Sequence, residues 1–167
     1  IWLVFLELVV VNFAWFFNIH FSFAILAVIW ALGVSMMILA ALIHLPRMAI
    51  LITGIVFVAG HNLLDHFHVP GDSAGAIAWA VLHEQKAFSF GNWHFISIYP
   101  LLPWIGLMAL GYSMGYLYHR DADPVKRKRL LLQIGSGSLL LFILLRSINR
   151  YGDLIPWARQ STPVFSF

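Results

Sequence analysis

The stretch from residue 47 to residue 68, RMAILITGIVFVAGHNLLDHFH, sets an apolar run directly before a cluster of ionisable side chains. A helix of about 20 apolar residues crosses the hydrocarbon core of a bilayer, so residues 47–64 fit one membrane span. Placing ionisable groups at the end of such a run costs free energy, so their presence indicates a structural or functional role. At helical spacing His61, Asp65 and His68 fall at i, i+4 and i+7, so we expect them on one helix face.

The whole chain is strongly apolar. Of its 167 residues 61% are hydrophobic and only 10% are charged, against about a quarter charged in soluble domains, and its mean hydropathy is +0.86. This composition predicts an integral membrane protein whose first partner is the lipid bilayer, and nucleic acid is not an expected partner. The chain contains no cysteine, which excludes disulfides and thiolate metal sites.

We predict an all-α fold, a polytopic transmembrane helix bundle that forms a single partial domain over residues 1–167. About five spans are expected, at residues 1–17, 23–45, 47–64, 96–119 and 125–148. Residues 65–95 hold several glycine and proline breakers and are predicted to form a long outer loop with a short interfacial helix. Residues 149–167 are predicted to form an outer tail. The apolar character of both ends leads us to expect a fragment that lacks an N-terminal part and further C-terminal spans.

The loop before the last predicted span is basic. It carries four consecutive positive residues, Lys126, Arg127, Lys128 and Arg129. Because lysine and arginine mark cytoplasmic loops, we predict that residues 120–129 are cytoplasmic in an inner (cell) membrane and that the His61 cluster faces outward. The same four residues are our candidates for binding the phosphates of a cytoplasmic donor, although orientation alone explains them equally well. Asp123 and Pro124 predict the start of the following helix.

The histidine cluster admits three interpretations from the residues alone. A histidine transfers protons near neutral pH, and Asp65 would orient His61 for that role. The same helix face could hold a metal together with His83 or His94, or the polar groups could simply hydrate a helix end. Our working hypothesis assigns acid–base catalysis to His61 and Asp65, substrate binding to His68 and His94, and no metal.

Two polar residues interrupt the first predicted span. Glu7 lies near its middle, where a lone carboxylate should be protonated or paired. Asn12 lies nearer the outer end, and the two could form a buried polar track through the bundle. The alternative is that both serve helix–helix contacts, since polar side chains also bridge helices structurally.

The segment RSINRYGD at residues 146–153 combines two arginines with an aromatic side chain. Guanidinium groups at a membrane surface bind carboxylate, sulfate or phosphate with two hydrogen bonds, and a tyrosine ring can stack on a sugar. We therefore predict that substrate is bound by Arg146, Asn149, Arg150, Tyr151 and Asp153. An arginine pair held by Asp153 and lipid headgroups is an equal alternative.

Four segments carry a family resemblance: Leu6-Glu7-Leu8 with Val11-Asn12-Phe13, VIWALGVS at 28–35, GHNLLD at 60–65 and RSINRYGD at 146–153. Together they resemble the bacterial branch of the heparan-alpha-glucosaminide N-acetyltransferase catalytic-domain family, a group of transmembrane acyltransferases. The resemblance implies transfer of an acetyl group from cytoplasmic acetyl-CoA to an acceptor across the membrane. In animal members this acceptor is a terminal glucosamine of heparan sulfate. The histidine associated with that transfer lies upstream of anything that matches Ile1, so no residue here inherits it.

Combining the residues with the resemblance, we expect a membrane acetyltransferase. Its expected acceptor is a small molecule or glycan, namely an amino sugar or a cell-envelope glycan. Acetyl-CoA would bind at the basic loop, the acyl group would reach the polar track, and His61 would deprotonate the acceptor. A transporter or permease that uses the same buried polar groups is the main alternative, and a non-catalytic membrane scaffold is a third possibility. The sequence leaves open whether the chain forms a homo-oligomer.

Overall fold

The computed structural model describes residues 1–148, 151–152 and 158 of the chain. It separates into two compact units, residues 1–113 and 114–167. The first unit opens with one helical segment made of α1 (Trp2–Phe5), the π-helical η1 (Leu6–Val11) and α2 (Asn12–Phe16). It continues with β1 (Phe23–Leu26), α3 (Val28–Leu42), α4 (Arg47–Gly60), the 3-10 turn η2 (His61–Leu64), α5 (Ala74–Leu82), β2 (Lys86–Phe90), β3 (Trp93–Ser97) and α6 (Leu101–Ser113).

A three-stranded sheet in the order β1-β3-β2 corrects the all-α prediction, although the chain is mostly helical. β1 pairs with β3 in parallel, and β2 pairs with β3 in an antiparallel hairpin. The hairpin turns at Gly91, whose φ of 61° suits a two-residue turn. Burial in β1 alternates with period two, as a strand requires. The second and fourth predicted spans therefore become helical only at Val28 and Leu101.

Helices α4 and α6 pack closely through glycine. A Cβ added at Gly106 would lie 2.8 Å from Phe57 Cβ and 3.0 Å from Val58 N, and one added at Gly54 would lie 2.8 Å from Leu110 Cδ2. These contacts place the first half of α6 beside the last half of α4, so the two helices run antiparallel. The spacing of Gly111 and Gly115 predicts a close helix contact there. However, a Cβ added at either would meet no atom within 4 Å.

Two helices of the described chain are long and apolar enough to cross a membrane, Arg47–Leu64 and Pro124–Ile148. They coincide with the third and fifth predicted spans. The helices Trp2–Phe16 and Val28–Leu42 are apolar but shorter. The count of five spans stays a prediction, and so does the outer placement of residues 65–95, which contain α5, β2 and the start of β3.

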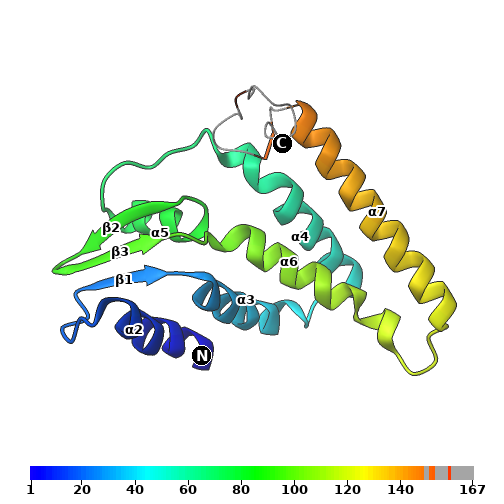
Figure 1. Cartoon of the computed structure of the whole chain (residues 1–167), viewed down its shortest axis with the longest axis horizontal. Coiled ribbons are helices and arrows are strands. Elements are labelled where there is room, and N and C mark those ends of the chain that lie inside the picture. The colour runs from blue at the N-terminus through cyan, green and yellow to red at the C-terminus, as the bar shows by residue number, and fades with distance from the viewer. Residues whose placement is uncertain (149–150, 153–157, 159–167) are drawn as a thin grey trace. The chain divides into compact units, whose positions relative to one another are not determined.

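The buried core of the first unit joins the sheet to the helices. Its residues come from β1, α3, α5, β2 and α6, and they are Leu26, Trp30, Ala31, Ala80, Phe88, Leu101 and Ile105. β1 leads into the start of α3, and β3 leads into the start of α6 (Figure 1). Because α4 runs antiparallel to α6, the end of α4 with η2 lies at this same end of the unit.

The second unit consists, as far as it is described, of η3 (Met114–Tyr118) and α7 (Pro124–Ile148) joined by a short loop. The carboxylate Oδ1 of Asp123 accepts hydrogen bonds from the backbone N–H groups of Val125 at 2.8 Å and Lys126 at 3.4 Å. Pro124 takes the first helical position, where no intrahelical donor is needed. The predicted start of this helix is therefore confirmed.

Candidate functional site

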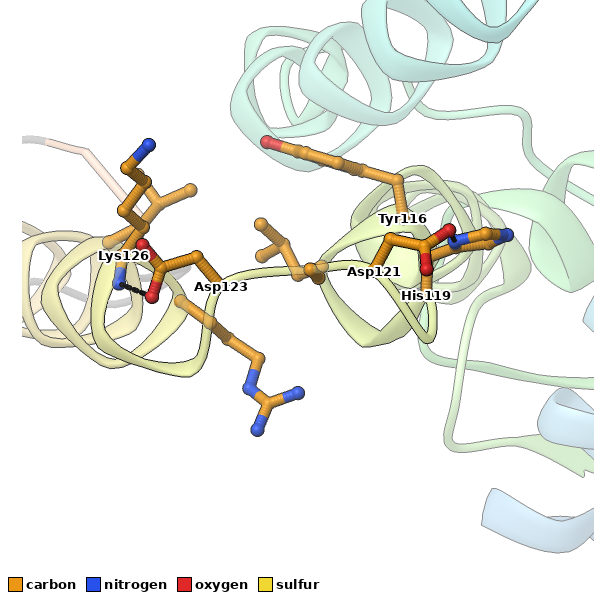
Figure 2. Close-up of a pocket in the computed structure, with 9 residues that line it drawn as sticks. Tyr116, His119, Asp121, Asp123 and Lys126 are labelled. Atoms are coloured by element: carbon orange, nitrogen blue, oxygen red, sulfur yellow. Dashed lines mark hydrogen bonds and ion pairs between the residues drawn. The ribbon is translucent and has the colours of Figure 1, made fainter.

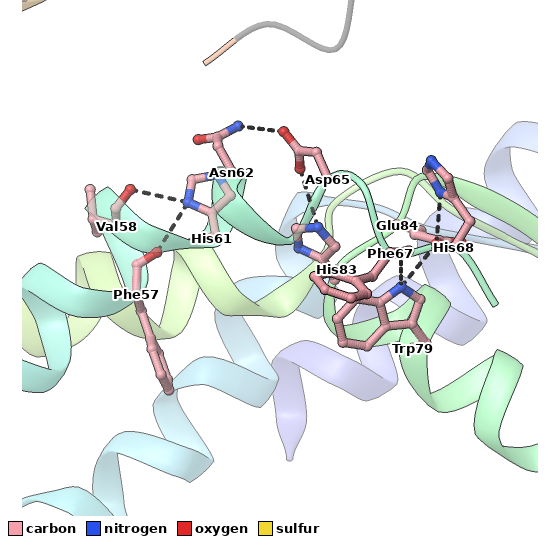
Figure 3. A network of polar contacts seen from close by, with 10 residues as sticks. All are labelled: Phe57, Val58, His61, Asn62, Asp65, Phe67, His68, Trp79, His83 and Glu84. Atoms are coloured by element: carbon pink, nitrogen blue, oxygen red, sulfur yellow. Dashed lines mark hydrogen bonds and ion pairs between the residues drawn. The ribbon is translucent and has the colours of Figure 1, made fainter. Parts of the chain in front are cut away.

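The His61 ring is fixed by backbone carbonyls at the end of α4. Its Nδ1 lies 3.0 Å from the oxygen of Phe57 and 3.0 Å from that of Val58. Carbonyl oxygens only accept hydrogen bonds, so Nδ1 must carry the proton and donate to them. In the neutral ring the lone pair is then on Nε2, the nitrogen that would act as a base. Figure 3 shows the two contacts and the neighbouring network.

Asp65 pairs with His83 and does not orient His61, so that part of our prediction is wrong. Asp65 Oδ1 lies 3.2 Å from His83 Nε2, and Asp65 Oδ2 accepts a hydrogen bond from Asn62 Nδ2 at 3.2 Å (Figure 3). The reason is that α4 ends at Gly60 and the 3-10 turn η2 ends at Leu64. The i, i+4, i+7 face therefore does not continue through Asp65.

The sequence predicts for His83 only a role as an additional metal ligand. In the structure it is the partner of Asp65. Its side chain is 2% exposed, and its ring centroid lies 5.0 Å from that of Trp79. With Nε2 at the carboxylate, Nδ1 is the remaining ring nitrogen, and it is buried without a hydrogen-bond partner in the described chain. The sequence spacing of residues 65 and 83 does not predict this pair, because the two residues are brought together only by the fold of the segment between them.

His68 belongs to a second polar contact that ties the segment after η2 to α5. Its Nδ1 lies 3.1 Å from Glu84 Oε1. The same carboxylate oxygen accepts a hydrogen bond from Trp79 Nε1 at 2.9 Å, and Trp79 Nε1 also lies 2.9 Å from the carbonyl of Phe67. Glu84 and Trp79 were not singled out by sequence reasoning.

His94 stands apart from these contacts. It lies in β3, and its Nδ1 is 2.9 Å from Ser89 Oγ of the paired strand β2. The predicted histidines thus have separate partners. Among the residues that the structure describes, no three His, Cys, Asp or Glu side chains are grouped as a metal site would require.

Glu7 caps the N-terminus of another helix. It is 2% exposed, and its Oε2 accepts hydrogen bonds from the backbone N–H groups of Ile29 at 3.0 Å and Trp30 at 3.2 Å, in the first turn of α3. These donors have no intrahelical acceptor, and the positive end of the helix dipole favours a negative charge beside them. The carboxylate in the apolar segment is therefore paired, as the sequence required.

Asn12 binds the free edge of β1. Its Oδ1 accepts from Ile25 N at 2.6 Å, and its Nδ2 donates to Ile25 O at 3.0 Å and to the main-chain oxygen of Glu7 at 2.7 Å. The backbone N–H of Asn12 also donates to Glu7 O, closing an i to i+5 turn at the end of η1. In a regular α-helix a separation of five residues places side chains on different faces, and the wider turn lets both reach β1 and α3.

A cavity of about 420 Å³ lies beside this pair, lined by residues of the first helical segment, β1, the start of α3 and the residues after β3. Its lining is mainly apolar and aromatic, and it includes Trp15, Phe16, Ile25 and Tyr99 with Glu7 and Asn12. The structure thus brings the two predicted track residues together at one cavity.

A second pocket of about 420 Å³ lies within the second unit, between η3 and the start of α7 (Figure 2). Of the four predicted basic residues, Lys126 and Arg127 line it, whereas Lys128 and Arg129 do not. The guanidinium of Arg127 lies 5.2 Å from the ring centre of Tyr118, within cation–π distance.

Both acids of this pocket have partners. Asp123 caps α7, and Asp121 Oδ2 lies 3.3 Å from Nδ1 of His119. No side-chain partner of Lys126 is found in the described part of the chain. The pocket thus combines the positive charges of Lys126 and Arg127 with the two carboxylates of Asp121 and Asp123.

The predicted tail site falls largely beyond what is described. Arg146 lies in the last turn of α7, and Tyr151 is described in a short bend. Asn149, Arg150 and Asp153 lie outside the described residues, so the substrate-binding role of this segment stays a prediction.

Comparison with known proteins identifies the family. The profile of heparan-alpha-glucosaminide N-acetyltransferase, catalytic, matches residues 2–146. The chain belongs to this family. Neither the curated proteins nor the solved structures gave a match. Three of the four segments that carry the resemblance lie inside the matched range, and the segment 146–153 begins at its last residue.

Membership in the heparan-alpha-glucosaminide N-acetyltransferase catalytic family suggests an N-acetyltransferase. The family is membrane-associated, and acetyltransferases of this type use acetyl-CoA as acyl donor. Two helices that could span a membrane agree with this association. No comparison supports the transporter alternative.

Proposed function

We propose that this chain is part of a membrane N-acetyltransferase that moves an acetyl group from cytoplasmic acetyl-CoA to an amino sugar or cell-envelope glycan on the outer face. The family match across residues 2–146 carries this proposal. The two pockets add groups that the proposal uses, since one presents two cations beside two carboxylates and the other presents a carboxylate among aromatic rings.

The acceptor side is assigned to the end of the first unit where α4 ends. His61 is our candidate for the group that takes up the proton released when the acceptor amine forms its amide. Its Nδ1 is held by two carbonyls, which leaves Nε2 as the base. The Asp65–His83 pair would hold the turn that follows, because it joins the residue after η2 to the residue after α5.

The donor side is assigned to the pocket before α7. CoA carries phosphates, and Lys126 with Arg127 would pair with them at the N-terminal end of a long helix, where the dipole adds to the attraction. Arg47, at the opposite end of α4 from His61, fits a cytoplasmic position for this end of the span.

The acceptor role of His61 is tested by acetyl transfer in proteoliposomes loaded with acetyl-CoA. Removing a general base lowers turnover by about 10²- to 10⁴-fold, so His61→Ala should reduce kcat by that order. His66→Ala is the matched control, because His66 lies five residues on and is exposed. Full activity of His61→Ala would remove the proposed role of this residue.

The donor site is tested by comparing two double variants of the same helix turn. Lys126→Gln with Arg127→Gln removes two charges that line the pocket, whereas Lys128→Gln with Arg129→Gln removes two that do not. We expect the KM for acetyl-CoA to rise about tenfold or more in the first variant only, since a charged hydrogen bond contributes about 1.5–3 kcal/mol. Acetyl-pantetheine, which lacks the nucleotide phosphates, should show no such difference. Equal effects of the two variants would refute this donor site. The four charges would then be explained by the orientation of the loop in the membrane alone.

A further inference from the structure

The cavity beside α3 presents one unused carboxylate oxygen. Oε2 of Glu7 accepts the two N–H groups of Ile29 and Trp30. Oε1 makes no hydrogen bond to any described residue. It is also not one of the fully buried side-chain atoms without a partner, so part of its surface is accessible. Since Glu7 lines the cavity, this oxygen is the charged group open to a ligand there.

Asn12 does not share that role, because its amide is already occupied. Both of its side-chain atoms are used by Ile25 and by the main chain of Glu7. The other named lining groups are apolar or aromatic, with Trp15, Phe16 and Tyr99 among them. The cavity therefore offers one negative oxygen surrounded by aromatic faces.

This combination favours a ligand that carries an ammonium group on a small apolar framework. A carboxylate oxygen pairs with an ammonium group through charge-assisted hydrogen bonds, and aromatic faces attract the same cation. An anionic ligand would be repelled, and a purely apolar one would leave the Glu7 oxygen unpaired. Aromatic rings also stack against the apolar face of a sugar ring.

We propose that Glu7 binds the ammonium group of the acceptor amine in this cavity, with Trp15 and Tyr99 flanking the body of the acceptor. The proposal rests on the acetyltransferase function proposed above and names the residue that recognises its acceptor. The start of α3 and the end of α4 both lie at the end of the unit where α6 begins, because β1 and β3 run in parallel into α3 and α6, and α4 runs antiparallel to α6. Glu7 would act as a specificity-determining residue for amines.

The experiment measures binding of methyl glucosaminide and of its neutral N-acetyl counterpart to the full protein in lipid nanodiscs by calorimetry. The wild-type protein should bind the amine at least about tenfold more tightly than the acetamide, as expected for a hydrogen bond between charged groups. Glu7→Gln keeps an oxygen for the N–H groups of α3 but removes the charge, so it should lose this preference. Asp72→Asn removes a charge at an exposed position away from the cavity and should keep it.

Each outcome decides between the two proposals. Equal wild-type affinity for amine and acetamide would overturn the inference, whether or not Glu7→Gln folds. A preference that survives in a folded Glu7→Gln would overturn it as well, even where acetyl transfer in proteoliposomes is intact. A Glu7-dependent preference without any acetyl transfer would instead uphold the cavity and refute the proposed function.

Discussion

The contact between α4 and α6 should discriminate sharply between two glycines of the same helix, Gly106 and Gly111. A Cβ added at Gly106 would stand 2.8 Å from Phe57 Cβ, 2.9 Å from Val58 Cγ2 and 3.0 Å from Val58 N. The last atom belongs to the backbone of α4, so it cannot move aside by changing rotamer. A Cβ added at Gly111 would meet nothing within 4 Å.

The size of the effect follows from two opposing terms. Overpacking of this kind costs about 1–3 kcal/mol. Alanine is favoured over glycine in a helix by no more than about 1 kcal/mol, and this gain is common to both positions. We therefore expect Gly106→Ala to be less stable than Gly111→Ala by about 1–3 kcal/mol, the size of the overpacking term alone.

The assay is equilibrium unfolding of both variants and the parent protein, followed by circular dichroism as denaturing detergent is titrated into mild micelles. Gly111→Ala should unfold at or above the midpoint of the parent protein, and Gly106→Ala should unfold below that of Gly111→Ala. Because His61 directly follows α4 and its ring is held by the carbonyls of Phe57 and Val58, Gly106→Ala should also lower acetyl transfer more than Gly111→Ala does. Equal stability of the two variants would refute the close packing of α4 on α6.

Three further outcomes are expected. Asp123→Ala should lower the stability of α7 by about 0.5–2 kcal/mol in the same titration, because it removes the N-cap, and an unchanged midpoint would argue against that cap. Asp65→Asn and His83→Gln should be non-additive, with a coupling of about 0.5–3 kcal/mol in a double-mutant cycle, whereas additive losses would mean that the pair does not interact. Since the chain has no cysteine, Leu63→Cys and Val125→Cys, both at exposed positions, can be labelled singly with a membrane-impermeant maleimide. They should react from opposite sides of the bilayer, and reaction from one side would overturn the proposed orientation.

Length and hydropathy were sufficient to locate the helices at residues 47–64 and 124–148, because a continuous apolar run has few alternatives. The sheet was missed because its strands are also apolar and adjoin helices. One local signal was available: Gly91 with the asparagine that follows it separates two segments in which Phe88, Phe90, Trp93 and Phe95 alternate with other residues, a pattern typical of a hairpin. The parallel pairing of β1 has no such local signal, since its partner β3 is distant in the sequence.

The candidate site was predicted where side chains act within their own segment and missed where they act across segments. Glu7 and Asn12 stood out because polar residues in an apolar run need partners. The pairing of Asp65 with His61 assumed a continuous α-helix, but α4 ends at Gly60, before both residues, and the chain continues as a 3-10 turn. The partner that Asp65 does have, His83, comes from the far side of α5, and helical periodicity carries no information about it.

The missed sheet and the role of Glu7 have the same physical cause. A helix running without interruption from residue 23 to residue 45 would satisfy the N–H groups of Ile29 and Trp30 with its own carbonyls, and Glu7 would have nothing to cap. Because β1 replaces the first turn, α3 starts inside the unit, and its first donors need an acceptor where water is scarce. Glu7 supplies that acceptor with Oε2 alone, which takes both N–H groups. Because one oxygen suffices for the cap, Oε1 remains for the ligand that we propose.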